Sequence, residues 1–432
     1  MHSSDRAPHK GPMRTFAQTL LILVLVASVA SLMAWAHSRV TRSSDHTAAQ
    51  QATVGRAGES RADEITPEPS PDWIRSNSAV WDAKGTLVSE DPLTDLQPDL
   101  AAYMGQGKRA AYRSVSGLTG AATEVSGTFF IPKGTPPSGG WPVASFAHGT
   151  TGLTTECAPS AAPDLRGYVG VIFWLLSAGY AVAFTDYEGL GGPGLHPLLE
   201  PKTAAFNVID AVRALRALYP DISTRWVAVG NSQGGQAAWA ANELNSFYGG
   251  GLDLVGSVAL APAADLSGLA DLAYQQTLTP EQLTLMPLII VGTQRSAPTV
   301  AVDHLLHGSA AAAQDILIGC GEAAQRFGTV LPADVKPTDS SDRDAFAKSL
   351  RSLALPKAKL SAPMLVMSGT RDPKVFPEWI SAAVDRSCRL GGQIALIEVP
   401  GAGHDLAPDE RVRVWMSNRF IDAPAPTTCG AR

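Results

Sequence analysis

The chain is poor in charged side chains and has no excess of positive charge. Of its 432 residues only 17% are charged, and the formal net charge is −6 with a pI near 5.9. No stretch combines clustered lysines and arginines with interleaved aromatic residues. Because a nucleic-acid partner requires such a basic surface, we expect no nucleic-acid partner.

Several signatures of cofactor chemistry are also missing. The sequence has no Gly-rich phosphate-binding loop, no pairing of cysteine and histidine at zinc spacing and no internal repeat. We therefore expect no metal and no organic cofactor. The chain is instead 45% hydrophobic, which at this length allows one large core together with an insertion.

The N-terminal segment predicts export from the cytoplasm. Basic residues precede an uncharged apolar stretch at 16–36, which ends in small residues that resemble a signal-peptidase site. The stretch is also long enough to span a bilayer. We expect residues 1–36 to be a signal peptide or a retained signal anchor, so the protein is extracytoplasmic, either secreted or membrane-associated through this segment. Residues 37–71, rich in Ser, Thr, Ala, Arg, Glu and Pro, are expected to form a disordered linker.

The most informative motif is the G-x-S-x-G pattern centred on Ser232. A β-forming run at 226–229 precedes it, and a helix-forming run at 236–244 follows. A strand, a tight turn and a helix place Ser232 at the tip of the turn, where the helix N-terminus favours negative charge. The bare pattern also fits a β-turn followed by a helix N-cap, but this context favours a nucleophile.

A serine nucleophile needs a base and an orienting acid, and both follow downstream. Residues 362–373 indicate a buried strand ending in a loop that carries Asp372. A second predicted strand at 394–399 is followed by His404. The order serine, acid, histidine is that of α/β-hydrolases, so we predict the triad Ser232, Asp372 and His404.

Two other aspartates compete for the role of acid. Asp265 follows an apolar run at 254–262, where some hydrolases place their acid. Asp405 is adjacent to His404, but a sequence neighbour does not easily reach the same ring. We expect Asp405 instead to cap a helix at 410–420, and Asp372 remains the predicted acid.

The segment His148-Gly149-Thr150 predicts half of an oxyanion hole. A strand leads into this His-Gly pair, and in this fold the loop after that strand supplies one oxyanion donor. The backbone N–H groups of Thr150 and Gln233 are the predicted donors. We expect His148 to shape the loop rather than to act as a second base.

The order of predicted elements indicates an α/β fold. Up to Pro262 strands and helices alternate, which is typical of a parallel sheet covered on both faces. Between there and Pro356 the pattern is helical, and the stretch between Ser232 and Asp372 is far longer than one strand and crossover need. We therefore expect an α/β-hydrolase fold with a mostly parallel central sheet and an inserted helical cap, or lid. The predicted parts are core residues 72–264, cap residues 265–357 and core residues 358–432.

The chain has four cysteines. In an exported protein they suggest two disulfides, and the sequence leaves all three pairings open.

Taken together, these motifs make the chain resemble the secretory lipase family, which includes lipase A-type enzymes and actinobacterial secreted esterases. The matching segments are His148–Gly152, Thr185–Gly189, Gly230–Gly235, Gly369–Asp372 and Gly401–His404. The resemblance implies a carboxylic ester hydrolase that acts on ester or lipid substrates. It also implies the disulfides Cys157–Cys320 and Cys388–Cys429, and an acidic residue of the segment 186–189 that can support the oxyanion region.

Two alternatives to this function remain open. An acyltransferase would use the same triad but pass the acyl group to an alcohol instead of water. A non-catalytic binding protein of the hydrolase fold is the other alternative, although such proteins usually lack one member of the triad.

Overall fold

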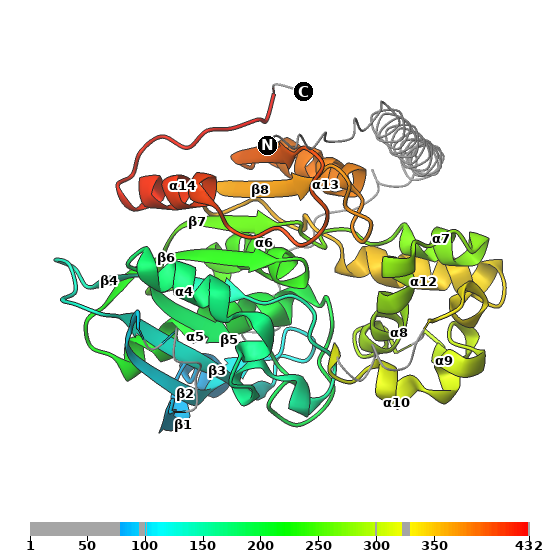
Figure 1. Cartoon of the computed structure of the whole chain (residues 1–432), viewed down its shortest axis with the longest axis horizontal. Helices are drawn as coiled ribbons and strands as arrows, with labels where there is room; N and C mark the ends of the chain where they lie inside the picture. The colour runs from blue at the N-terminus through cyan, green and yellow to red at the C-terminus, as the bar shows by residue number, and fades with distance from the viewer. Residues whose placement is uncertain (1–77, 95–99, 101, 299, 322–328, 431–432) are drawn as a thin grey trace, which may run out of the picture. The chain divides into compact units, whose positions relative to one another are not determined.

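The structure is a computed structural model, and it describes residues 78–94, 100, 102–298, 300–321 and 329–430 (Figure 1). The predicted signal segment at 1–36 and the predicted linker at 37–71 lie outside these residues. Among the helices of the described ranges, none combines the length and apolar character needed to cross a membrane.

The centre of the fold is one nine-stranded sheet with the order β1-β2-β3-β5-β4-β6-β7-β8-β9. The strands are β1 (Leu87–Pro92), β2 (Met104–Val115), β3 (Ala122–Pro132), β4 (Trp141–Ala147), β5 (Ala181–Thr185), β6 (Ile222–Asn231), β7 (Asp253–Leu260), β8 (Met364–Gly369) and β9 (Ile394–Val399). The pairs β1–β2, β2–β3 and β3–β5 are antiparallel, and the five remaining pairs are parallel. The sheet is therefore mostly parallel, as predicted.

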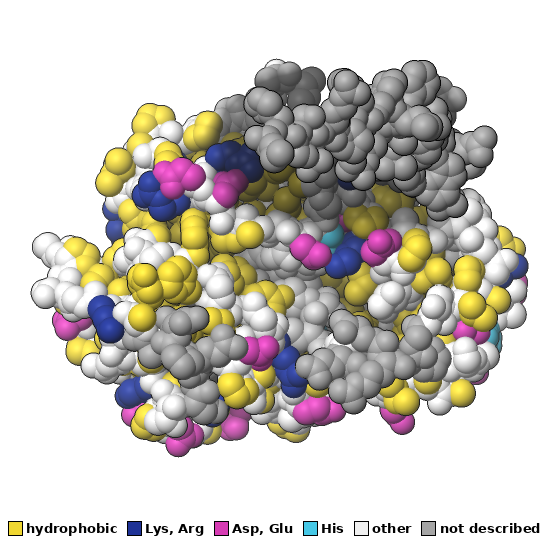
Figure 2. All heavy atoms as spheres, in the orientation of Figure 1, with side chains coloured by type: hydrophobic (Ala, Val, Ile, Leu, Met, Phe, Trp, Pro, Cys, Tyr) yellow, Lys and Arg dark blue, Asp and Glu magenta, His cyan; other side chains and the backbone are white. Residues whose placement is uncertain are grey.

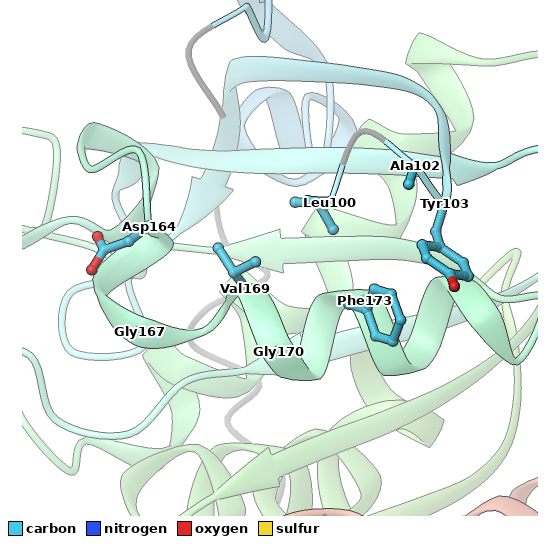
Figure 3. Close-up of a pocket in the computed structure, with 8 residues that line it drawn as sticks. All are labelled: Leu100, Ala102, Tyr103, Asp164, Gly167, Val169, Gly170 and Phe173. Carbon is cyan, nitrogen blue, oxygen red and sulfur yellow. The ribbon is translucent and has the colours of Figure 1, made fainter. Parts of the chain in front are cut away.

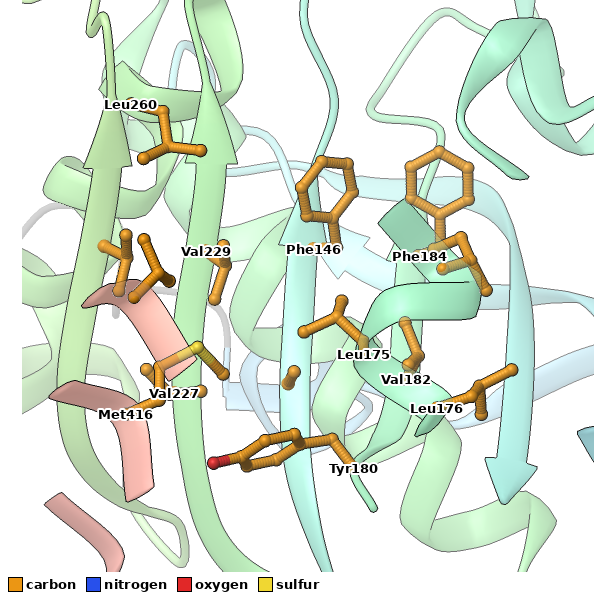
Figure 4. Packing of buried hydrophobic residues seen from close by; sticks show 14 of the residues in the cluster. Phe146, Leu175, Leu176, Tyr180, Val182, Phe184, Val227, Val229, Leu260 and Met416 are labelled. Carbon is orange, nitrogen blue, oxygen red and sulfur yellow. The ribbon is translucent and has the colours of Figure 1, made fainter. Parts of the chain in front are cut away.

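Helices cover both faces of this sheet. Helices α4 (Val169–Ser177) and α14 (Glu410–Phe420) pack on one face, where Leu175 and Met416 meet alternate residues of the strands, such as Phe146 (Figure 4). Because side chains alternate along a strand, Ser145 points to the other face, and its hydroxyl donates to a carbonyl of α5 (Pro201–Leu218). Helix α6 (Gln233–Tyr248) packs on that second face through Asn242, which donates to Ser257 of β7.

Helix α5 begins five residues before the start that apolar periodicity predicts, which is Phe206. The carboxylate of Glu200 accepts hydrogen bonds from the N–H groups of Lys202 and Thr203, and Pro201 occupies the first turn. A capping side chain followed by proline starts a helix regardless of which face is apolar.

The segment between β7 and β8 is helical, as expected. Its helices are α7 (Leu269–Gln275), α8 (Pro280–Gln294), α9 (Gly308–Ala312), α10 (Gln314–Leu317) and α12 (Ser340–Leu353), and Figure 1 shows them grouped beside the sheet. The described residues between β7 and β8 include no strand. The first helix begins at Leu269, and before it Asp265 accepts a hydrogen bond from the N–H of Ser267 and holds a turn.

The remaining elements are a short helix at the start of the described chain, a helix between β8 and β9, and several 3₁₀ turns. They are α2 (Ser78–Asp82), α13 (Pro377–Arg389), and the 3₁₀ turns η3 (Thr155–Cys157), η4 (Pro159–Ala161), η5 (Leu165–Gly167), η6 (Val302–His304) and η7 (Pro332–Val335). Two disulfides are present, Cys157–Cys320 and Cys388–Cys429, and these are the pairs that the family resemblance implies. The first disulfide links the loop region after β4 to the helical segment.

Candidate active site

Ser232 occupies the tight turn between β6 and α6. Its φ of 56° lies in the left-handed region, a strain of about 1–3 kcal/mol that the surrounding contacts must hold. The Ser232 N–H donates to Leu260 O at 2.9 Å, and its carbonyl accepts from Ala263 N at 3.0 Å, so the turn is fixed to the end of β7. A Cβ on Gly230 or on Gly234 would collide with backbone atoms, which explains both glycines of the motif.

Of the three predicted triad residues, His404 lies within hydrogen-bond distance of both others. His404 Nδ1 is 2.7 Å from Asp372 Oδ2, and His404 Nε2 is 2.8 Å from Ser232 Oγ. Because Nδ1 faces a carboxylate it carries the ring hydrogen, which leaves Nε2 to accept the serine proton. Asp372 is fully buried and His404 is only 6% exposed, so solvent barely competes for these contacts.

The loops after β8 and β9 support the acid and the histidine. The second oxygen of Asp372, Oδ1, accepts from the backbone N–H groups of Lys374 at 2.8 Å and Val375 at 3.0 Å. The Arg371 N–H donates to Ala402 O, which ties the acid loop to the loop that carries His404. Both side chains thus follow parallel strands at the carboxyl edge of the sheet.

The rival aspartates have other partners. Asp265 forms a buried ion pair with Arg386 at 2.8 Å. Asp405 is exposed and forms an ion pair with Lys374 at 3.4 Å. The prediction that Asp405 caps the last helix is wrong, because Asp409 accepts from the N–H groups at the start of α14 and is the residue directly before the helix.

The predicted oxyanion residues lie beside Ser232. Thr150 and Gln233 line the same cavity as Ser232, and the Thr150 hydroxyl donates to Gln233 Oε1 at 3.1 Å. The Gln233 N–H lies in the first turn of α6, where N–H groups have no acceptor within the helix. Both residues therefore lie next to Ser232.

His148 shapes the loop that carries Thr150. Its imidazole is buried, and burial lowers the pKa of His148 to about 4, so the ring is neutral near pH 7. Nδ1 is 2.6 Å from Gly149 O, whereas Nε2 is 3.3 Å from Asp186 O, so the shorter contact favours the ring hydrogen on Nδ1. The Gly149 carbonyl and the Thr150 N–H belong to one planar trans peptide group and point in opposite directions, so this bond directs the Thr150 N–H away from the ring.

Sequence reasoning missed His196, which lies behind the oxyanion residues. Its Nδ1 donates to Glu188 O at 2.9 Å, so its Nε2 is the acceptor for the side-chain amide of Gln233. Burial lowers the pKa of His196 to about 3, which keeps the ring neutral in this role. The Glu188 carboxylate pairs with Arg295 at 2.6 Å. No motif surrounds His196 in the sequence, so nothing local indicated it.

A small apolar cavity lies against Ser232. Its volume is about 30 Å³, which accommodates one or two water molecules but no acyl chain. The lining is mostly aliphatic: Leu198, Leu199, Ala263, Leu266, Leu269, Leu285, Leu288, Ile289 and Val375, with Thr150, Ser232, Gln233, Gln282 and Lys374 as polar members. Helix α8 contributes a large share of this wall, so its position determines the space beside the nucleophile.

A larger groove of about 640 Å³ lies beside α4 (Figure 3). Tyr103 and Phe173 meet edge to face there, with ring centroids 4.2 Å apart. None of the predicted site residues lines it. On the face shown in Figure 2, basic side chains are scattered singly among acidic and hydrophobic ones rather than forming a stripe.

Comparisons with known proteins give a family match and several likenesses of fold. Residues 150–317 match the model of the family described as Secretory lipase. The comparison with curated protein sequences gave no match.

Several solved structures share the fold. The rice cell wall degrading esterase LipA from Xanthomonas oryzae, in a ligand-bound form, has 21% identity and a TM-score of 0.67, over 79% of this chain and 100% of that chain. Candida antarctica lipase A in its closed state has 18% identity and a TM-score of 0.68, over 85% of this chain and 88% of that chain. A putative hydrolase from Legionella pneumophila has 18% identity and a TM-score of 0.62, over 74% of this chain and 93% of that chain.

These likenesses show that the chain has the α/β-hydrolase fold, as predicted. The family match covers Thr150, Ser232, Gln233 and much of the helical segment. It confirms the predicted resemblance to the secretory lipase family, and the chain is a carboxylic ester hydrolase of the lipase and esterase class.

Proposed function

We propose that this ester hydrolase is a serine enzyme in which Ser232, His404 and Asp372 form the catalytic triad. The observation that carries the proposal is the position of His404, which bridges Asp372 Oδ2 at 2.7 Å and Ser232 Oγ at 2.8 Å. Each contact has the polarity that a general base between an acid and a nucleophile requires.

In the first half of the reaction, Ser232 Oγ attacks the ester carbonyl while His404 Nε2 takes the hydroxyl proton. The backbone N–H groups of Thr150 and Gln233 bind the negative oxygen of the tetrahedral intermediate. His404 then gives its proton to the departing alcohol, and the acyl group remains on Ser232. Asp372 holds the ring in the correct tautomer and stabilises its protonated form.

In the second half, a water molecule replaces the alcohol. His404 removes a proton from this water, which attacks the acyl-enzyme, and returns the proton to Ser232 Oγ as the carboxylic acid leaves. All the groups that this cycle needs come from the chain itself.

The aliphatic lining of the cavity supports a substrate with an apolar acyl group. Since the cavity holds only about 30 Å³, an acyl chain requires the wall beside Ser232 to move. We propose that the helical segment at 265–357 acts as a cap and that α8 is the part of it that moves. We further propose an extracytoplasmic location, which the secretory description of the matched family supports.

The test is hydrolysis of a p-nitrophenyl ester series from acetate to palmitate by the wild-type protein and its Ser232→Ala variant. We expect the variant to lose at least about a thousandfold in kcat while it keeps the wild-type melting temperature. The acyl length that the wild type hydrolyses fastest then indicates how long an acyl chain the opened pocket accepts. Ester cleavage by a folded Ser232→Ala variant would refute the triad. Serine-dependent acyl transfer to an added alcohol, without hydrolysis, would favour the acyltransferase.

A further inference from the structure

The N-terminus of α8 carries a capping box. Thr279 Oγ1 accepts from the Gln282 N–H at 3.0 Å, and Gln282 Oε1 accepts from the Thr279 N–H at 3.1 Å. This reciprocal pair satisfies two N–H groups at the helix start. It leaves each side chain with a donor that the helix does not use.

Both of these donors bind the loop that carries Asp372. The Thr279 hydroxyl donates to Pro373 O at 2.8 Å, and Gln282 Nε2 donates to Lys374 O at 3.2 Å. Gln282 is only 1% exposed, so little water is available as a substitute partner. The capping box therefore joins a helix of the segment between β7 and β8 to the loop after β8.

The two carbonyls belong to the same peptide groups that hold Asp372. The Pro373 C=O shares a peptide group with the Lys374 N–H, and the Lys374 C=O shares the next one with the Val375 N–H. These two N–H groups donate to Asp372 Oδ1. Because a peptide group is planar, a bond that fixes its C=O also fixes its N–H. Accepting a hydrogen bond at the C=O also strengthens the N–H as a donor.

We propose that Thr279 and Gln282 are positioning residues, which align Asp372 with His404 through these two peptide groups. The proposal rests on the triad assigned above. Asp372 uses Oδ1 for the two peptide N–H groups and Oδ2 for His404, so its orientation depends on both sets of bonds.

This arrangement links the wall of the cavity to the acid of the triad. Leu285, Leu288 and Ile289 of α8 line the cavity, and the first turn of the same helix holds the Asp372 loop. A displacement of the α8 N-terminus would break both contacts to the loop. The triad is therefore fully aligned only while this end of α8 is docked.

The first test compares Thr279→Val with Thr279→Ser in p-nitrophenyl ester hydrolysis. Valine has the shape of threonine without the hydroxyl, whereas serine keeps it. We expect Thr279→Val to lower kcat about two- to tenfold, the effect of one lost hydrogen bond, with KM unchanged. Thr279→Ser should restore the wild-type kcat. Thr284→Val is the matched control, because Thr284 lies on the same helix, is exposed and donates its hydroxyl to Pro280 O of that helix.

Since Thr279→Val also removes the helix cap, a second variant separates capping from the contact to the acid loop. Gln282→Glu keeps an acceptor for the Thr279 N–H, and glutamate is itself a capping-box residue. Its ionised carboxylate has no donor for Lys374 O, whereas its protonated form can still donate to this carbonyl, and both forms keep the capping acceptor. We expect kcat relative to the wild type to fall about two- to tenfold as this carboxyl ionises, together with a lower melting temperature from the charge at a site that is 1% exposed.

Wild-type kcat in both Thr279→Val and Gln282→Glu would overturn the proposal, and so would an equal loss in Thr284→Val. The triad is judged separately by Ser232→Ala. Loss of activity in Ser232→Ala, together with wild-type kcat in Thr279→Val and Gln282→Glu, would overturn only the proposal that Thr279 and Gln282 position Asp372. Activity in Ser232→Ala would overturn both the triad and this positioning proposal.

Discussion

At the residue scale, Asp372 and Asp265 are both buried but have partners of opposite kinds. Asp372 faces the ring of His404 and two peptide N–H groups. Asp265 faces the guanidinium of Arg386, which also donates to Leu355 O. One carboxylate can therefore orient a base, while the other neutralises a buried charge.

This difference predicts separate effects for two conservative substitutions. Asp372→Asn should lower kcat about ten-thousandfold, because an amide favours the wrong tautomer of His404. Asp265→Asn should leave kcat within about threefold but reduce the free energy of unfolding by about 3–5 kcal/mol, because Arg386 stays buried without its counter-charge. Steady-state kinetics and urea unfolding of both variants provide the measurements. A larger loss of kcat in Asp265→Asn than in Asp372→Asn would exchange the roles of the two residues.

At the scale of elements, the two disulfides close stretches of very different length. Cys157–Cys320 spans a sequence separation of 163 residues, and Cys388–Cys429 spans 41. If a disulfide acts mainly by restricting the unfolded chain, the longer stretch gives the larger stabilisation. The longer one also joins the oxyanion side of the core to the helical segment.

We therefore expect removal of the first bond to cost more than removal of the second. Replacing Cys157 and Cys320 by alanine should reduce the free energy of unfolding by about 1 kcal/mol more than replacing Cys388 and Cys429. Denaturant unfolding of the two double variants tests the order, and peptide mapping without reductant tests the pairing. A linkage between Cys157 and Cys429 in that map would contradict the structure.

Strand and helix order could be predicted from the sequence, because hydrophobic periodicity and the motifs at strand ends are local signals. The early start of α5 at Pro201 and the wrong assignment of Asp405 as a helix cap both come from capping side chains that apolar periodicity does not register. His196, Thr279 and Gln282 could not be predicted, because each acts on a residue far away in the sequence, such as Gln233 or Pro373. Such contacts exist only after the loops have packed together.

At the scale of the whole molecule, buried titratable groups set opposite pH dependences of stability. Burial lowers the pKa of His148 to about 4 and that of His196 to about 3, from an ordinary value of 6.5. Below pH 6.5 these two histidines bind more protons in the unfolded chain than in the folded one. The free energy of unfolding therefore decreases as the pH falls from 6.5 towards 3. Glu243 acts in the other direction, because burial raises its pKa from 4.5 to about 8 even though Trp239 and two backbone N–H groups donate to its carboxylate.

A single substitution can isolate the contribution of Glu243 to the pH dependence of stability. Between pH 4.5 and about 8 the folded chain holds the Glu243 proton more tightly than the unfolded chain, so stability decreases as pH rises. Glu243→Gln cannot titrate, so the unfolding free energy of the wild type relative to this variant should decrease steadily from pH 5 to pH 8. Urea unfolding of both proteins at intervals across that range measures the difference. A difference that stays flat or rises with pH would mean that the three N–H donors outweigh burial and that Glu243 is ionised in the folded protein.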